Sequence, residues 1–283
     1  MNKYTSLNQN DGYMIPQLGF GTFLLENYEE CKKAVLLALK NGYRHIDTAQ
    51  VYKNEAAVGD AIRESGIVRE EIYLTTKIWA SNLGYEKTKK SLQRSMEKLK
   101  VEYVDLVLIH RPYGNYIDTW KALEEAVIEK KIHSIGISNF NIKQTQEILD
   151  IAKIKPVINQ IECHPYYQQK DLRMFLKQKD ILTEAWYPLG HGDKNLFCDS
   201  LLLELAKKYH KSVAQVILRW HIQVENIVFP KTTSEDHMKE NYDIFDFELT
   251  DEEINRISMI DKNKSYFKGP EWIDRLKAIF IIV

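Results

Sequence analysis

Residues 104–110, VDLVLIH, decide the fold class of this sequence. Apart from Asp105 the run is aliphatic until it ends at His110. A nearly continuous apolar run of this length is typical of a parallel strand that is covered on both faces. Because side chains alternate between the faces of a strand, Leu106, Leu108 and His110 lie on one face. If His110 points inward, the two leucines below it fill the interior.

Seven further runs of the same kind lie on either side of residues 104–110, and segments of helical period separate them. This alternation predicts a parallel sheet with crossover helices. The other predicted strands are residues 17–23 (QLGFGTF), 43–49 (YRHIDTA), 72–79 (IYLTTKIW), 134–140 (SIGISNF), 156–162 (PVINQIE), 181–188 (ILTEAWYP) and 226–231 (NIVFPK). Eight β/α units predict an α/β fold, a (β/α)8 TIM barrel formed as one domain by residues 1–283. An open doubly wound sheet is the alternative on pattern alone.

The segments between the strands begin and end at good capping residues. Residues 199–223 are long enough for two helices that break near Ser212, where a serine can cap the second. Beyond the eighth strand, residues 249–260 predict an extra C-terminal helix that starts at Thr250 with acidic residues in its first turn. At the other end of the chain, Asp11-Gly12 predicts the turn of an N-terminal β-hairpin that plugs the barrel. Residues 27–42 predict a helix whose buried face holds Cys31, Ala34, Val35, Ala38 and Leu39.

The composition excludes several classes of function. The net charge is −1, whereas nucleic acid and anionic membranes attract a positive field. No apolar run reaches the length of a membrane span, and the N-terminus is too polar for a signal peptide. The apolar run at residues 277–283 predicts a packed tail. Three widely spaced cysteines favour a cytoplasmic protein, and their spacing is not that of metal ligands, so we expect no metal. We also expect a monomer.

Four polar side chains lie at or just beyond the carboxyl ends of consecutive predicted strands, where barrel enzymes hold their active sites. They are Asp47, Tyr52, Lys77 and His110. Carbonyl reduction needs a hydride donor and an acid that protonates the forming alkoxide. A free tyrosine has a pKa of about 10, and we expect the Lys77 ammonium to lower the pKa of Tyr52. Asp47 would hold Lys77 charged, and His110 would donate a hydrogen bond to the carbonyl oxygen.

The chain resembles the aldo-keto reductase family along nearly its whole length. The most specific matches are GYRHIDTAQVYKNE at residues 42–55 and INQIECHPY at residues 158–166. LGFGTF, TTKIW, VDLVLIHRP, IGISNF, PLG and FPKTTSEDHMKENYDIFDFELT follow the family in the same order. The resemblance implies that the four residues above are a catalytic tetrad. It also implies an NADPH-dependent oxidoreductase that acts on CH–OH donors and reduces aldehydes or ketones to alcohols.

The resemblance also implies a cofactor site across the strand ends. The family binds NADP(H) in an extended form without a Rossmann domain, and the sequence has no G-x-G-x-x-G motif. Trp186 would stack on the nicotinamide ring. The carboxamide of the nicotinamide would bind Ser138, Asn139 and Gln160. Further cofactor contacts would come from Gly21, Thr22 and Leu189.

The adenosine end of the cofactor would lie against residues 230–241. Phosphate contacts are implied for Lys231 and Thr232, and adenine contacts for Glu240 and Asn241. His237 stands where the family usually has an arginine against the 2′-phosphate, and a neutral histidine cannot replace a bidentate guanidinium. We therefore expect NADPH to be preferred through Lys231, but less strongly than is usual, with NADH as the alternative cofactor. A second departure lies at Tyr187 and His191, where the pyrophosphate loop of the family often carries serines.

The substrate pocket implied by the resemblance is lined by Phe23, Trp79, His110 and Arg111. Aromatic walls suit a small aldehyde or ketone. An arginine is less usual at position 111, and it favours a carboxylate or polyhydroxy substrate unless it simply points to solvent. The tail after Ile260 is short, whereas long tails in the family close over bulky substrates. We expect small aldehydes, dicarbonyls or sugar-derived ketones.

Two other functions remain open. A barrel lyase could use Lys77 as a Schiff-base nucleophile, since barrels host many reactions. A non-catalytic relative could bind NADPH and serve as a regulatory subunit. Taken singly, Asp47 could be a strand-end cap, Tyr52 a surface tyrosine, and Ser138-Asn139 a helix cap. The four tetrad residues together favour the reductase.

Overall fold

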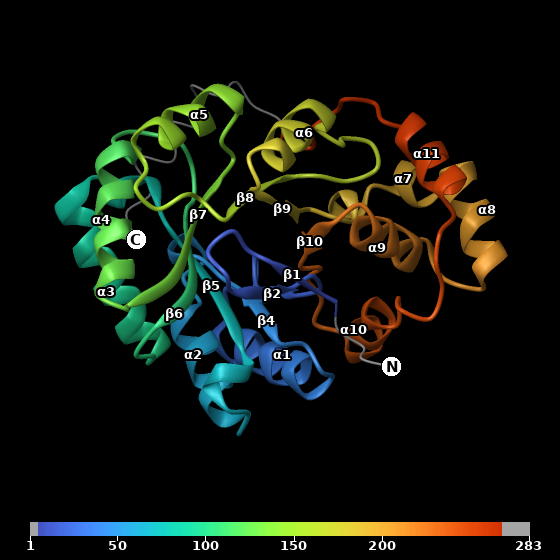
Figure 1. Ribbon diagram of the computed structural model, residues 1–283. Coiled ribbons are helices and arrows are strands. Elements are labelled where there is room, and N and C mark those ends of the chain that lie inside the picture. Colours follow the sequence, from blue (N-terminus) through green and yellow to red (C-terminus); the bar gives the residue numbers. More distant parts are fainter. Residues whose placement is uncertain (1–4, 268–283) are drawn as a thin grey trace.

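Eight parallel strands form the centre of the computed structural model, which describes residues 5–267 (Figure 1). They follow one another around the sheet in sequence order. The last strand returns to the first, because Leu18 bridges to Val228 and the Gly19 amide donates to the Val228 carbonyl oxygen at 2.7 Å. The sheet is therefore a closed barrel, and the open-sheet alternative is wrong. The strands are β3 (Phe20–Gly21), β4 (His45–Asp47), β5 (Tyr73–Ile78), β6 (Val104–Ile109), β7 (Ile132–Ser138), β8 (Ile158–Glu162), β9 (Leu182–Trp186) and β10 (Asn226–Val228).

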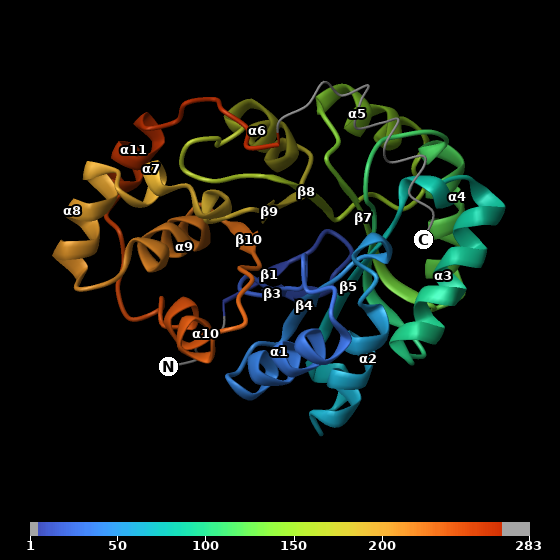
Figure 2. The ribbon, with the colours of Figure 1, turned by 180° about the vertical axis from the view of Figure 1, so that it is seen from behind.

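Helices surround the strands on all sides (Figure 2). Ser212 and Thr250 both form capping boxes, so the predicted break within residues 199–223 and the extra C-terminal helix are confirmed. The face predicted for residues 27–42 is also the buried face of the first helix. The helices are α1 (Tyr28–Lys40), α2 (Glu55–Glu64), α3 (Tyr85–Leu99), α4 (Tyr116–Ile128), α5 (Ile142–Ile151), α6 (Lys170–Gln178), α7 (Lys194–Phe197), α8 (Ser200–Tyr209), α9 (Val213–Gln223), α10 (Glu235–Tyr242) and α11 (Asp251–Met259).

The strands at the closure are shorter than predicted. Pro230 has no N–H to donate, so β10 cannot continue through the predicted residues 226–231. β3 covers only two of the predicted residues 17–23. A Cβ at Gly21 would lie 2.6 Å from the Phe229 carbonyl oxygen, so only glycine allows the backbone to approach so closely at this point. The closure of the barrel thus depends on the close approach of the backbone at Gly21 to the backbone at Phe229.

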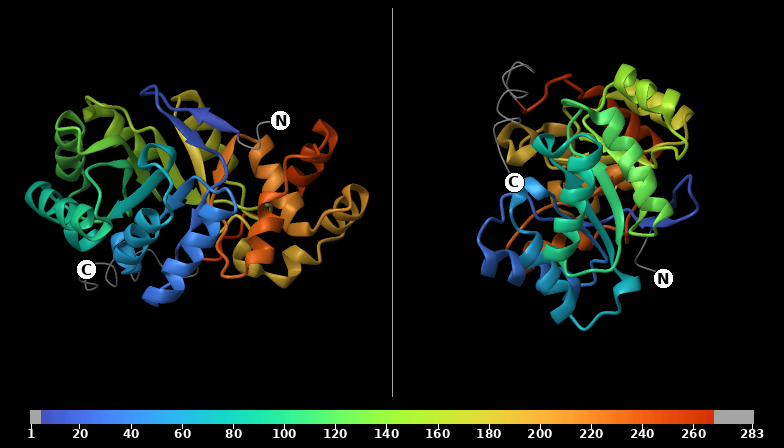
Figure 3. Two further views of the ribbon diagram at one scale, coloured as in Figure 1. Left: turned by 90° about the horizontal axis from the view of Figure 1, so that it is seen from below. Right: turned by 90° about the vertical axis from the view of Figure 1, so that its left-hand side faces the viewer.

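A hairpin closes the amino end of the barrel. β1 (Ser6–Asn8) and β2 (Met14–Pro16) pair antiparallel and project from the strands in Figure 3. Ile15 of β2 is fully buried in one apolar cluster with Leu106 and Leu108 of β6. The predicted plug is therefore present, and the two leucines fill the interior as expected.

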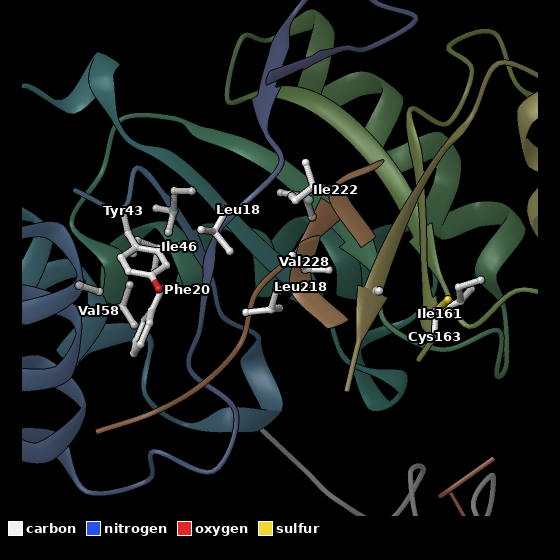
Figure 4. Close-up of a cluster of buried hydrophobic side chains, with 14 of the residues drawn as sticks. Leu18, Phe20, Tyr43, Ile46, Val58, Ile161, Cys163, Leu218, Ile222 and Val228 are labelled. Carbon is white, nitrogen blue, oxygen red and sulfur yellow. The ribbon is translucent and has the colours of Figure 1, made fainter. Parts of the chain in front are cut away.

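A second and larger apolar core lies between the barrel and its helices. Figure 4 shows part of it, in which Phe20 and Ile46 from the strands lie with Val58 of α2. Val107 and Ile109, on the outer face of β6, also belong to this core. Each strand is therefore covered on both faces, as its apolar sequence predicts.

Some sequence predictions concern features outside the site. The packed tail predicted at residues 277–283 lies outside the described residues. Within residues 5–267, no helix is both long and apolar enough to cross a membrane. No group of three or more His, Cys, Asp or Glu side chains in that range is arranged to hold a metal ion. The three cysteines are free thiols, two of them buried.

Candidate active site

The four residues of the predicted tetrad meet at the carboxyl end of the barrel. Asp47 ends β4, Lys77 lies on β5, and His110 follows β6. Tyr52 ends a short 3-10 helix, Gln50–Tyr52, that follows β4. The Lys77 Nζ lies 2.6 Å from the Asp47 Oδ1 and 3.4 Å from the Tyr52 hydroxyl oxygen. The ring centroids of Tyr52 and His110 are 5.8 Å apart.

Lys77 is fully buried and has a partner for each of its three ammonium protons. It donates to Asp47, to Tyr52 and to the Thr48 carbonyl oxygen, the last at 2.9 Å. Burial lowers the pKa of Lys77, but the charge and hydrogen bond of Asp47, together with the charges of Tyr52 and Glu184, outweigh burial and the net shift is upward. Burial also raises the pKa of Asp47, and Lys77 opposes that shift. The pair is an ammonium ion held in place by a carboxylate.

The pKa of Tyr52 differs from the sequence expectation. Burial raises the pKa of Tyr52 to about 12, although the Lys77 charge lowers it. Lys77 therefore acts in the expected direction, but the expected net lowering of the pKa is wrong because burial has the larger effect. The phenol is fully protonated at neutral pH and available as a proton donor.

His110 is a neutral group in this environment. Burial lowers its pKa well below the usual value, and the charges of Lys77 and Arg111 lower it further. A neutral imidazole carries one N–H donor and one acceptor nitrogen. The Nδ1 atom of His110 has no hydrogen-bond partner within residues 5–267. The ring packs edge-on against Trp79, with centroids 5.0 Å apart.

A buried carboxyl group that the sequence analysis missed lies next to the tetrad. The Gln160 Nε2 donates to the Asp47 Oδ2 and to the Glu184 Oε2, both at 2.9 Å. Burial raises the pKa of Glu184 to about 8, and the negative charge of Asp47 contributes to the shift. Glu184 precedes Trp186 by two residues and so lies on the same strand face, which is the signal that could have revealed it.

The tetrad opens into a cavity of about 710 Å³ that runs along the strand ends. Most predicted site residues line this cavity: Gly21, Phe23, Asp47, Tyr52, Trp79, His110, Arg111, Asn139, Gln160, Trp186, Leu189 and Lys231. The sequence analysis missed other lining residues, namely Leu24, Val51, Tyr113, Pro188, Gly192, Phe197, Phe229, Pro230 and Phe267. The walls are mainly aromatic and apolar, as is usual for a small-molecule site.

The remaining predicted site residues do not line the cavity. The buried hydroxyls of Thr22 and Ser138 donate to the backbone oxygens of Asp47 and Gln160 at 2.9 and 3.0 Å. They brace the backbone beneath the cavity. Four others lie beyond Lys231, in the connection to α10 or on α10 itself: Thr232, His237, Glu240 and Asn241. Of these four, His237 is exposed and Asn241 is buried.

Trp186 is held in place by a hydrogen bond to Asn139. Its Nε1 donates to the Asn139 Oδ1 at 2.9 Å, and the Asn139 Nδ2 donates to the His110 carbonyl oxygen at 3.1 Å. The backbone of Asn139 is left-handed, with φ of 64°, a conformation that asparagine tolerates. Tyr187, next to Trp186, stacks on His191 with ring centroids 4.5 Å apart. Aromatic rings thus occupy the loop in which the family often carries serines.

The segment after α11 reaches the cavity. The Tyr266 amide donates to Glu162 at 2.6 Å, and its hydroxyl donates to Asp193 at 2.5 Å. These contacts bring the next residue, Phe267, to the cavity wall, where its ring centroid lies 4.5 Å from the Arg111 Cζ. No local sequence pattern marks Phe267, because contacts of Tyr266 to residues 73 and 104 positions earlier place it.

The chain is similar to known proteins along nearly its whole length. The sequence profile of the aldo/keto reductase family matches residues 17–262. The 9,11-endoperoxide prostaglandin H2 reductase of Trypanosoma cruzi is 44% identical over 270 residues, 95% of each chain. The glyoxal reductase of Bacillus subtilis is 44% identical over 263 residues, 93% of this chain and 95% of the other. The crystal structure of a Bombyx mori aldo-keto reductase in complex with NADP is 35% identical, with a TM-score of 0.90 over 95% of this chain and 97% of the other.

Proposed function

Because the chain belongs to the aldo/keto reductase family, we propose that it uses NADPH to reduce small aldehydes and α-dicarbonyl compounds to alcohols, with Tyr52 as the proton donor. One observation carries this proposal. The Tyr52 hydroxyl lies 3.4 Å from a buried ammonium group and beside a neutral histidine, at the floor of a cavity of about 710 Å³.

The residues that line the cavity support an extended dinucleotide as the cofactor. It continues from Trp186 past Leu189 to Lys231, where an exposed ammonium group is available for a phosphate. The family membership and the relative solved with NADP support this cofactor. Trp186 would hold the nicotinamide ring, with Asn139 and Gln160 near its carboxamide. When bound, NADPH supplies the hydride that reaches the carbonyl carbon.

Tyr52 delivers the proton. An alkoxide is a much stronger base than a phenolate, so proton transfer from Tyr52 is favourable even with a pKa of about 12. The phenolate that forms lies next to the Lys77 ammonium, which stabilises it. Asp47 keeps Lys77 in position through the 2.6 Å ion pair.

His110 orients the substrate in this proposal. Its ring is neutral and lies on the cavity wall facing Tyr52. A single imidazole N–H can donate to the carbonyl oxygen without competing as a strong acid. The oxygen is then held between the Tyr52 hydroxyl and the His110 ring, which fixes the carbonyl for attack.

The two other functions fit the geometry less well. A Schiff-base lysine must be neutral and reach the substrate, whereas Lys77 is fully buried, charged and bound to Asp47. A purely regulatory NADPH-binding protein has no need for four catalytic side chains in contact.

The free cysteines support a cytoplasmic location for the activity.

The test is the loss of NADPH absorbance with glyoxal, followed for the parent protein and for His237→Arg. We expect the parent to turn over glyoxal and to prefer NADPH to NADH. One added charge-assisted contact corresponds to roughly a tenfold gain in that preference for the variant. A parent protein that oxidises no NADPH with any aldehyde contradicts the proposal. A parent preference for NADH contradicts the cofactor assignment alone.

A further inference from the structure

We propose that Arg111 forms a carboxylate subsite, so that this chain favours aldehydes and ketones that carry a carboxylate near the reacting carbonyl. The inference rests on the proposed function, since it names the substrate class of the same site. Arg111 directly follows His110, which would hold the carbonyl oxygen, and its side chain lines the same cavity. A carboxylate on the substrate would therefore meet Arg111 close to the reacting end.

The charge of Arg111 is not used elsewhere in the described chain. No carboxylate within residues 5–267 forms an ion pair with it. The two other cations at the site differ from it. Lys77 is buried and bound to Asp47, and Lys231 lies at the opposite end of the cavity, beyond Phe229 and Pro230. Arg111 is thus the cation available at the substrate end.

Phe267 holds the guanidinium without using its hydrogen-bond donors. The Arg111 Cζ lies over the Phe267 ring, 4.5 Å from its centroid. The aromatic ring attracts the guanidinium charge without accepting a conventional hydrogen bond, so the N–H groups of Arg111 remain available. A planar fork of donors matches both oxygens of a carboxylate. The contact with Phe267 therefore holds the guanidinium in place and leaves its hydrogen-bond donors available.

The surroundings of Arg111 strengthen an interaction with an anion. Trp79 and Tyr113, both buried, form an apolar cluster on the cavity wall. Charge–charge contacts are stronger beside such side chains than in bulk water. The positive charge of Arg111 also lowers the pKa of Tyr52 and of His110, which shows that it acts at the reacting end of the cavity.

The test compares matched substrates that differ in a carboxylate. Glyoxylate replaces one aldehyde group of glyoxal with a carboxylate, and 4-oxobutanoate replaces the terminal methyl group of butanal with one. For Arg111→Gln we expect kcat/KM to fall roughly 10- to 100-fold for the two anionic substrates, chiefly through KM. For glyoxal and butanal we expect a change of less than about threefold. Arg111→Lys should recover part of the loss, because it keeps the charge but not the fork.

Two controls make the outcome decisive. Arg94→Gln removes the same charge from α3, away from the cavity, and should leave all four substrates unchanged. Propanoate, which cannot be reduced, should inhibit glyoxal reduction competitively in the parent and more weakly in Arg111→Gln. Equal effects of Arg111→Gln on charged and neutral substrates overturn the subsite while the reductase stands. A parent protein that reduces none of the four substrates overturns the proposed function instead.

Discussion

The two ends of the barrel interior are built from the same strands but hold different kinds of side chain. On β6, Leu106 and Leu108 pack with Ile15 at the plugged end, and the next inward-facing residue, His110, lies in the cavity. On β5, the inward series ends at Lys77, a charged group with no exposure to solvent. The plugged end is held by apolar contacts and by hydrogen bonds of Gln9 with Tyr73 and Ser134, whereas the open end holds buried charges that depend on their partners.

This difference predicts how each end responds to substitution. When a side chain in an apolar layer is truncated, the protein loses stability in proportion to the volume removed, and the catalytic reaction is little affected. A buried charge network loses both stability and activity when one member is removed, because its partner is left without compensation. The predictions below test that contrast.

The largest effect is expected for Lys77→Met. Asp47 would become an uncompensated buried charge, so we expect the free energy of unfolding to fall by about 3–5 kcal/mol. Loss of the ammonium beside Tyr52 should lower kcat for glyoxal by roughly 10²- to 10⁴-fold. Urea unfolding and NADPH oxidation measure the two effects.

The matched control is Lys77→Met combined with Asp47→Asn. Removing the second charge should restore much of the stability but none of the activity. A double variant that recovers turnover would show that the open end is not a catalytic network.

A smaller effect is expected for Leu108→Ala at the plugged end. The truncation should lower the free energy of unfolding by about 2–5 kcal/mol, as for other buried leucines. Turnover of glyoxal by the folded protein should stay within about threefold of the parent, because the substitution removes no charge or hydrogen bond. Leu108→Met, which keeps the volume, should lose less than about 1.5 kcal/mol. A large loss of kcat in Leu108→Met would contradict the claim that substitutions at the plugged end leave catalysis unaffected.

For Glu184→Gln the expected effect is on the pH dependence of stability rather than on turnover. The folded-state pKa of Glu184 is about 8 and its ordinary value is 4.5. The folded state therefore binds the extra proton between these values, and stability falls as pH rises through that window. We expect this group to contribute a slope of up to about 1.4 kcal/mol per pH unit, which the glutamine variant loses. Urea unfolding of both proteins between pH 5 and pH 8 checks it, and identical slopes contradict the assignment.

Much of this contrast could be predicted from the sequence, because it follows from strand periodicity. The apolar run ending in His110 predicts both the filled interior and the polar group above it. The tetrad residues lie at or just beyond strand ends, and all four meet. The closure of the barrel at Gly21 and Phe229 shortens β3 and β10 in a way that local patterns do not show.

Other parts of the site depend on contacts between distant segments. Burial around Tyr52 comes from several elements, so its pKa of about 12 could not be estimated from the nearby lysine alone. Phe267 reaches the cavity through contacts of Tyr266 with Glu162 and Asp193. Glu184 was visible in principle, since it shares a strand face with Trp186, but an isolated acidic residue in a strand does not identify its partner.

The most direct test of the account is the rate of glyoxal reduction by Tyr52→Phe, which keeps the ring and removes only the hydroxyl. We expect turnover to fall by roughly 10²- to 10⁴-fold, while quenching of tryptophan fluorescence by NADPH is unchanged. Turnover equal to that of the parent would show that the proton comes from another group and would contradict the mechanism.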